Sequence, residues 1–371
     1  MREQVKNAQR WVVKVGSSLV TNDGEGLNRS LITKWSEQIV ELRAQNIEIV
    51  LVSSGSVAAG MRSLGWEKRP SALHQVQVAA AVGQASLVTY YEEVFAKHQV
   101  ITAQVLLTHG DFQSRQRYLN ARATFRSMME LGVLPVVNEN DTVAIDELRF
   151  GDNDSLAAMV ANLIDADLLV LLTDQDGLYD ANPSIDKSAT LINQSKATAP
   201  ELKEFAGSSG SQYGTGGMAT KVSAAIIAAK TGVSTVIANG RKDNILFKIA
   251  DEKEGTLLLG QSDGAVARKQ WLATQLHVKG KIVLDDGAAK VLLGSGSSLL
   301  PVGVLSVEGA FQRGDLVGCY NQAGDELARG LVNYSADDAN LIAGKRSKKI
   351  AEILGSVGDA ELIHRDNLTL V

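Results

Sequence analysis

Residues 168–172 read Leu-Leu-Val-Leu-Leu and contain no polar side chain. A strand that is apolar on both faces is typical of a parallel sheet covered by helices on both sides. Runs rich in β-branched residues occur at 11–15 and 47–52, and the stretch 73–97, rich in Ala, Val and Gln, indicates a helix. This alternation predicts an α/β fold for residues 1–260: a three-layer α/β/α sandwich with a mainly parallel sheet.

The sequence changes character after residue 260. Residues 261–275 are largely polar and predict a linker. Beyond the linker, short strand-like pieces are separated by glycines, at 281–284, 302–307, 316–320 and 327–332. This spacing predicts a second domain over residues 276–371, small, β-rich and barrel-like.

Composition limits the classes of function. The 371 residues include 37 Lys and Arg against 42 Asp and Glu, a net charge of -5, which gives no general attraction to nucleic acid or to an anionic membrane. A single cysteine, Cys319, excludes an internal disulfide and a cysteine-based zinc site. No apolar run approaches the ~20 residues of a membrane helix, and residues 1–10 lack the apolar core of a secretory signal. We therefore expect a cytoplasmic protein with no membrane partner.

Small, polar and cationic residues follow the predicted strands. Lys14 and Gly16 lie at the end of the first strand, Ser54 and Gly55 follow the second, and a glycine-rich loop opens the helix that carries Lys221. Glycine lets backbone N–H groups approach an anion, and helix N-termini and lysines favour negative charge. Since ligands bind at the carboxyl ends of parallel strands, the pattern predicts a site for a polyphosphate.

Two familiar phosphate motifs do not account for this pattern. The chain contains no G-x-x-x-x-G-K-[ST], which excludes a P-loop. Residues 214–219 formally match G-x-G-x-x-A, but the residues before them do not form a strand, so a dinucleotide fingerprint is rejected.

Taken together, the loops resemble the amino-acid kinase family. The resemblance lies in the order and spacing of six segments: VKVGSS (13–18), VSSGSVAAG (52–60), VNEND (137–141), GDND (151–154), LTDQDGLY (172–179) and GTGGMATK (214–221). Residues 276–371 resemble a PUA domain, through GSSLLPVGV (296–304) and FQRGD (311–315). The first resemblance implies a kinase that transfers the γ-phosphoryl of ATP to the side-chain carboxylate of L-glutamate, giving L-glutamyl 5-phosphate, the first step of proline biosynthesis.

The resemblance also implies a role for individual residues. Lys14 would contact the transferring phosphoryl, Lys221 the phosphates of ATP, and Asp154 would orient the two lysines. L-Glutamate would be held by Ser54, Asp141 and Asn153, with Asp141 beside its α-ammonium. Gly16 and Gly55 would supply backbone N–H groups to the phosphoryl. The residues expected to bind ATP are Lys14, Gly16, Thr173, Asp174, Thr215, Gly216, Gly217, Met218, Ala219, Thr220 and Lys221.

The same resemblance implies several ligands and partners. Mg²⁺ would bind mainly through phosphate oxygens, so no protein ligand is assigned to it. A glutamate carboxylate has a pKa near ~4.3 and is already an ionised nucleophile, so the reaction needs no general base. Proline is expected as a feedback inhibitor at or overlapping the glutamate pocket. The expected assembly is a homo-oligomer, either a dimer or a tetramer.

Other interpretations remain open at this point. Without the resemblance, Ser54 and Asp154 could simply cap helices, and Asp141 could be an ordinary turn residue. A sister kinase would act on another carboxylate, on carbamate or on a nucleoside monophosphate. A third alternative is an RNA-binding protein that uses the PUA domain. From Lys279 onward, however, 10 Lys and Arg face 12 Asp and Glu, whereas phosphate-backbone binding needs a positive excess, so RNA is not an expected partner.

Overall fold

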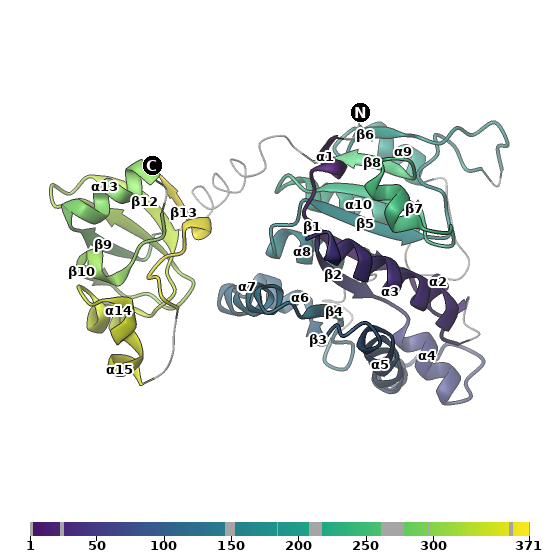
Figure 1. Cartoon of the computed structure of the whole chain (residues 1–371), viewed down its shortest axis with the longest axis horizontal. Coiled ribbons are helices and arrows are strands. Elements are labelled where there is room, and N and C mark those ends of the chain that lie inside the picture. The colour runs from purple at the N-terminus through teal and green to yellow at the C-terminus, as the bar shows by residue number, and fades with distance from the viewer. Residues whose placement is uncertain are drawn as a thin grey trace. The chain divides into compact units, whose positions relative to one another are not determined.

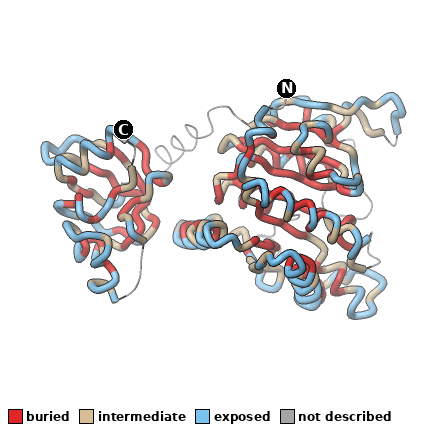
Figure 2. The backbone as a smooth tube through the Cα atoms, viewed as in Figure 1, coloured by how far each residue is buried: buried red, intermediate tan, exposed pale blue. Residues whose placement is uncertain are grey.

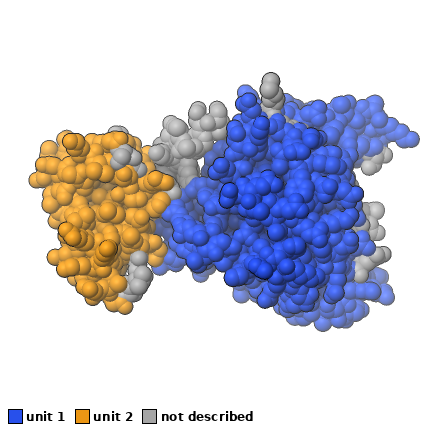
Figure 3. Space-filling model, in the orientation of Figure 1, with its two compact units in different colours: residues 1–264 blue, residues 265–371 orange. Residues whose placement is uncertain are grey.

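The chain forms two compact units, residues 1–264 and 265–371 (Figure 3). The computed structural model describes residues 3–22, 26–144, 153–183, 185–207, 217–260, 278–295, 297–355 and 359–370. The predicted linker at 261–275 lies outside these residues, and its bounds stay a prediction. Each unit is therefore described by itself.

An eight-stranded sheet forms the centre of the first unit (Figure 1). The strands lie in the order β3-β4-β2-β1-β5-β7-β8-β6. The first six strands in this order, β3, β4, β2, β1, β5 and β7, run parallel to one another. Strand β8 is antiparallel to β7 and pairs in parallel with β6. The prediction of a mainly parallel sheet is confirmed. The bounds are β1 (Arg10–Val15), β2 (Glu48–Ser53), β3 (Thr102–Leu107), β4 (Leu134–Glu139), β5 (Leu168–Thr173), β6 (Gln194–Lys196), β7 (Ser234–Asn239) and β8 (Thr256–Leu259).

The register of the sheet brings three strand ends together. Val15, the last residue of β1, pairs with Ser53 of β2 on one side and with Leu172 of β5 on the other. Because these strands are parallel and end at the same level, the loops that follow them begin at the same edge of the sheet. This edge is where the predicted polyphosphate site must lie.

Helices cover both faces of this sheet, as predicted. Alternate residues of a strand point to opposite faces, so Val13 and Val15 of β1 enter a core with α3, α5 and α11, and Val12 enters a second core with α7, α8 and α10. Figure 2 shows the central strands as mostly buried. The bounds are α3 (Arg29–Ala44), α5 (Leu73–Ala96), α7 (Arg115–Glu130), α8 (Asn153–Leu163), α10 (Met218–Ala229) and α11 (Ile245–Ala250).

The remaining helices of the first unit are short. They are α1 (Glu3–Lys6), α2 (Ser17–Val20), α4 (Ser56–Ser63), α6 (His109–Gln113) and α9 (Glu201–Gly207). Across both units, none of the helices within the described residues combines the length and the apolarity that crossing a membrane requires.

Helices α4 and α5 cross at two glycines. A Cβ atom on Gly60 would lie 1.7 Å from the carbonyl oxygen of Ala79, and one on Gly83 would lie 1.8 Å from the carbonyl oxygen of Ser56. Only glycine, which has no Cβ, allows the two backbones to approach this closely. The crossing fixes the first residue of α4, Ser56, next to the carboxyl end of β2.

The second unit is built on a separate five-stranded sheet, which confirms the prediction of a small strand-rich domain. The strands lie in the order β10-β9-β11-β12-β13, and residues such as Ile282, Cys319 and Ile342 form its core. The bounds are β9 (Gly280–Leu284), β10 (Val304–Gly309), β11 (Leu316–Tyr320), β12 (Glu326–Leu331), β13 (Leu368–Leu370), α13 (Asp286–Ser295), α14 (Ala336–Ile342) and α15 (Ile350–Leu354), with single turns at Pro301–Gly303, Ser347–Lys349 and Arg365–Asn367.

Candidate active site

Lys14 is a buried cation at the end of the central strand. It follows Val13 in β1 and therefore points to the face of the sheet that carries α8 and α10. Only 4% of its surface is exposed. A buried ammonium group is costly unless a counter-charge lies beside it, so the fold must supply a carboxylate on this face.

Asp154 supplies that carboxylate and holds a second lysine as well. It is the second residue of α8, and none of its surface is exposed. Asp154 Oδ1 lies 2.5 Å from Lys14 Nζ, and Asp154 Oδ2 lies 3.0 Å from Lys221 Nζ. Lys221 stands in the first turn of α10 and is also buried. Segments from three distant parts of the sequence thus bring two cations to one carboxylate.

The electrostatics of this cluster favour an anionic ligand. Burial by itself would raise the pKa of Asp154, but the charges of Lys14 and Lys221 and their hydrogen bonds outweigh it and hold this pKa well below its ordinary value. Asp154 is therefore ionised at neutral pH. Two ammonium groups against one carboxylate leave one excess positive charge at the carboxyl ends of the strands, which suits a phosphate.

The loop after β2 meets the loop after β4 beside this cluster. The backbone N–H of Ser54 donates to the carbonyl oxygen of Val15 at 3.2 Å. Gly55 then adopts φ +99, a left-handed conformation that favours glycine, and α4 begins at Ser56. Ser56 Oγ donates to Asp141 Oδ2 at 3.4 Å, which joins the two loops.

Asn153 connects these loops to the lysine cluster. It is the first residue of α8, directly before Asp154, and it is buried. Its Nδ2 donates to the carbonyl oxygen of Ser53 and to Asn138 Oδ1, both at 2.6 Å. The three residues predicted to hold L-glutamate, Ser54, Asp141 and Asn153, are therefore linked through neighbouring residues at one edge of the sheet.

The residues predicted to bind ATP lie on the loops after β1 and β5 and at the start of α10. Thr173 ends β5, is buried, and donates from Oγ1 to Asp174 Oδ1 at 3.0 Å, while Asp174 is exposed. The Gly16 N–H donates to the carbonyl oxygen of Leu172 at 3.3 Å. This bond holds the start of the loop after β1 to β5, and the role of Gly16 toward the phosphoryl group stays a prediction.

The first turn of α10 approaches the cluster directly. Gly217 caps this helix, which begins with Met218 and Ala219. Thr220 Oγ1 lies 2.7 Å from the carbonyl oxygen of Gly217 and 3.0 Å from Asp154 Oδ2, and its one hydroxyl hydrogen is shared between these two acceptors. Two other residues of the predicted ATP loop, Thr215 and Gly216, lie outside the described residues.

Two residues of this region were not identified from the sequence. Asn138 is buried in β4 and donates from Nδ2 to Oε1 of the buried Gln84, in α5, at 2.6 Å. The signal for Asn138 was its place in the segment VNEND (137–141), directly after the predicted strand, although the structure includes it in β4. Gln84 gave no such signal, since its helix contains several glutamines.

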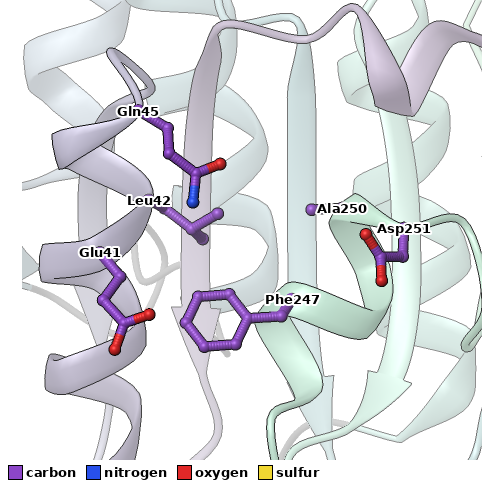
Figure 4. A pocket seen from close by; sticks show the side chains of 6 residues that line it. All are labelled: Glu41, Leu42, Gln45, Phe247, Ala250 and Asp251. Atoms are coloured by element: carbon purple, nitrogen blue, oxygen red, sulfur yellow. The ribbon is translucent and has the colours of Figure 1, made fainter.

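Within the described residues, no group of three or more His, Cys, Asp or Glu side chains is placed to hold a metal ion. A surface pocket occurs elsewhere, between α3 and α11 (Figure 4). The end of α3 leads into the amino end of β2, so this pocket lies away from the lysine cluster. Its lining residues are Glu41, Leu42, Gln45, Phe247, Ala250 and Asp251.

Comparison with known proteins gives consistent matches for both units. Residues 9–239 match the Amino acid kinase family, and residues 280–354 match the PUA domain. A glutamate 5-kinase of Methylococcus capsulatus is 54% identical over 370 residues, which cover 100% of this chain and 99% of that protein. A glutamate 5-kinase of Pseudomonas aeruginosa is 55% identical over 372 residues, covering 100% of both chains, and one of Paraburkholderia xenovorans is 53% identical with the same coverage.

Proposed function

The chain belongs to the amino acid kinase family, and from this premise we propose that it phosphorylates the side-chain carboxylate of L-glutamate with ATP. The product is L-glutamyl 5-phosphate, an acyl phosphate that begins proline biosynthesis. Full-length relatives that are glutamate 5-kinases support this substrate. The structural observation that carries the proposal is the pair of buried lysines, Lys14 and Lys221, on the single carboxylate of Asp154.

In the reaction, an oxygen of the glutamate side-chain carboxylate attacks the γ-phosphorus of ATP, and the bond from that phosphorus to the oxygen of ADP breaks. The carboxylate is ionised at neutral pH and loses no proton, so the chain need not provide a general base. The difficulty is the approach of an anion to a polyanion. Lys14 offsets this repulsion at the transferring phosphoryl, and Lys221 does so at the ATP phosphates.

Asp154 acts on the two lysines rather than on the substrates. Two ammonium groups at one site repel each other, and the carboxylate between Lys14 and Lys221 offsets that repulsion while it fixes both Nζ positions. Thr220 donates to the same carboxylate and ties the start of α10 to it. The cluster is thereby organised before the substrates bind, which is the condition for electrostatic stabilisation of a transition state.

The remaining site residues divide between the two substrates. Ser54, Asp141 and Asn153 hold L-glutamate, and the carboxylate of Asp141 is the partner for its α-ammonium. ATP is bound by Gly16, Thr173 and Asp174 and by the segment Thr215, Gly216, Gly217, Met218, Ala219, Thr220 and Lys221. The location of the described members of both sets on neighbouring loops at one sheet edge supports this division.

Mg²⁺ fits this site as a partner of the nucleotide rather than of the protein. Mg²⁺ commonly binds substrate phosphates with few carboxylates, and the ATP phosphates would supply most of its ligands here. When bound, the ion neutralises charge on the phosphates of ATP. Proline as a feedback inhibitor and a dimeric or tetrameric assembly are proposals that follow from the family, whereas the cytoplasmic location and the domain bounds 1–260 and 276–371 are proposals that follow from the sequence pattern.

A substrate panel tests the proposed function. The protein is incubated with ATP, Mg²⁺ and hydroxylamine together with L-glutamate, N-acetyl-L-glutamate, L-aspartate or uridine monophosphate. Hydroxylamine converts an acyl phosphate into a stable hydroxamate, while ADP release is followed in parallel. We expect hydroxamate and ADP in equal amounts with L-glutamate. ADP release with another substrate and none with L-glutamate would assign a sister kinase instead.

A further inference from the structure

Three buried amide side chains form one hydrogen-bonded chain next to the lysine cluster. Gln84 of α5 accepts at Oε1 from Asn138 Nδ2, and Asn138 of β4 accepts at Oδ1 from Asn153 Nδ2, each at 2.6 Å. Their exposed fractions are 9%, 2% and 8% in this order. The last member, Asn153, is one of the residues assigned to L-glutamate and stands directly before Asp154.

Two backbone groups fix which way the hydrogen bonds run between these three amide side chains. The N–H of Glu139 donates to Asn138 Oδ1 at 2.9 Å, and the carbonyl oxygen of Ser53 accepts from Asn153 Nδ2 at 2.6 Å. A backbone N–H can only donate and a carbonyl oxygen can only accept. Asn138 must therefore direct its oxygen to Asn153 and its nitrogen to α5, where Gln84 has to present an oxygen.

The direction of these hydrogen bonds determines which side-chain atom of Asn153 is left to bind a ligand. Its Nδ2 carries two hydrogens, and both are used, by Ser53 and by Asn138. Its Oδ1 accepts from no other residue in the part of the chain that the structure describes. Asn153 therefore offers an acceptor and no donor at the edge where Ser54 and Asp141 also lie.

We propose that Gln84 is a positioning residue: by accepting from Asn138 Nδ2 it holds the Asn138 amide against Asn153, and together with the Ser53 carbonyl this keeps the carbonyl oxygen of Asn153 toward the α-ammonium of L-glutamate. The inference rests on the proposed function and adds a specificity-determining residue to it. An ammonium group only donates and a carboxylate only accepts. Asn153 in this orientation thus favours a ligand with an amino group and disfavours a carboxylate at the same place.

The perturbation that isolates this role is Gln84→Met, which keeps the length of the side chain and removes the acceptor. The buried Nδ2 of Asn138 then lacks a partner, and a buried donor without one is costly. Asn138 can approach another acceptor only if its side chain shifts, which strains its bond to Asn153 and leaves the Ser53 carbonyl as the remaining described partner of Asn153 Nδ2. The orientation of Asn153 is then no longer fixed from this side.

The experiment compares L-glutamate with glutarate, which has the same two carboxylates and lacks the ammonium group. Dissociation constants of both ligands are measured by titration calorimetry for the wild type and for Gln84→Met. We expect the preference for L-glutamate over glutarate to fall about tenfold, the value of one hydrogen bond to a charged group. The KM for ATP should stay unchanged.

Two further variants show whether the acceptor itself matters. Gln84→Glu keeps an acceptor, so the preference for L-glutamate should not fall; its negative charge weakens both anionic ligands, and it weakens the dianion glutarate more than the monoanion L-glutamate. Gln38→Met is the matched control, because Gln38 is also a buried glutamine, bonded to Leu246 and Lys34 at 2.9 Å and placed in α3. It should lower stability and leave the preference unchanged.

The outcomes separate the inference from the proposed function. If wild-type protein forms no hydroxamate with L-glutamate, the proposed function fails. If the wild type is active and Gln84→Met weakens both ligands by the same factor, Gln84 is merely structural and the inference is overturned. Should Gln84→Met not fold, Gln84→Ala removes the same acceptor with a good helix former and is judged by the same ratio.

Discussion

Replacing Asp154 by asparagine should both destabilise the protein and inactivate it. The side chain keeps its shape in Asp154→Asn, but Lys14 and Lys221 are left buried without a counter-charge. At their distances of 2.5 and 3.0 Å from the carboxylate, each pair gains about 6 kcal/mol at an effective dielectric constant of about 20. The cost of desolvation cancels part of this gain. Since breaking a buried ion pair by removing one partner costs about 3–5 kcal/mol, we expect a loss of that size in the free energy of unfolding.

The pH dependence of this loss provides a second test. The pKa of Asp154 is lowered in the folded state, so the unfolded chain takes up this proton first as the pH falls. The stabilisation by Asp154 is thus complete above a pH of about 4 and is lost as the pH falls toward the folded-state pKa. Wild type and Asp154→Asn should differ by the same amount at neutral and weakly acidic pH, and the difference should shrink below a pH of about 4.

Urea unfolding, monitored by circular dichroism, measures the difference in unfolding free energy between the wild type and Asp154→Asn. The hydroxamate assay measures the activity of both proteins. Asn153→Ser is not a suitable control, because it disturbs the same site. Gln38→Met is suitable, since it removes a buried polar group in α3 and leaves the cluster intact. If Asp154→Asn lost less than about 1 kcal/mol of stability and kept its kcat within about threefold, the account of the buried charges would be wrong.

Three further predictions concern other parts of the chain. Gly83→Ala places a methyl group 1.8 Å from the carbonyl oxygen of Ser56, so urea unfolding should show a loss of about 1–3 kcal/mol; an unchanged midpoint would contradict the close crossing of α4 and α5. Tyr91→Phe removes the 3.0 Å hydrogen bond to Ser53 Oγ and should cost about 1 kcal/mol in the same measurement, whereas no loss would show that this bond contributes nothing. Burial raises the pKa of Cys319 to about 12, so Ellman's reagent should label it only after unfolding in guanidinium; rapid labelling of the native protein would show that the thiol is accessible.

The sequence predicted those helices and strands whose local residue pattern matches the way they are buried in the folded protein. Helix α5 was expected at 73–97 and is observed at Leu73–Ala96, and the apolar run at 168–172 is β5. Strand β8 and helix α13 were not anticipated. Thr256–Leu259 has only four residues, too few to show a period. Residues 286–295 lie in the region whose glycine spacing predicted short strands, so no helix was expected there.

The site was predictable wherever a motif marked the end of a strand. Lys14 and Lys221 were expected to converge, and the structure brings both to Asp154. The role of Gln84 could not be predicted from the sequence, because its contact with Asn138 spans 54 residues and depends on how α5 packs against β4. A glutamine in an amphipathic helix has no local feature that distinguishes a buried acceptor from a solvated side chain.

The measurement that tests the central claim most directly is the single-turnover rate of acyl phosphate formation by Lys14→Met. This variant removes one cation and leaves Asp154 paired with Lys221, so the circular dichroism spectrum should match that of the wild type. We predict that the rate with saturating ATP and L-glutamate falls by about a hundredfold or more. A folded Lys14→Met protein that forms L-glutamyl 5-phosphate within about threefold of the wild-type rate would contradict the claim that the lysine cluster carries the phosphoryl transfer.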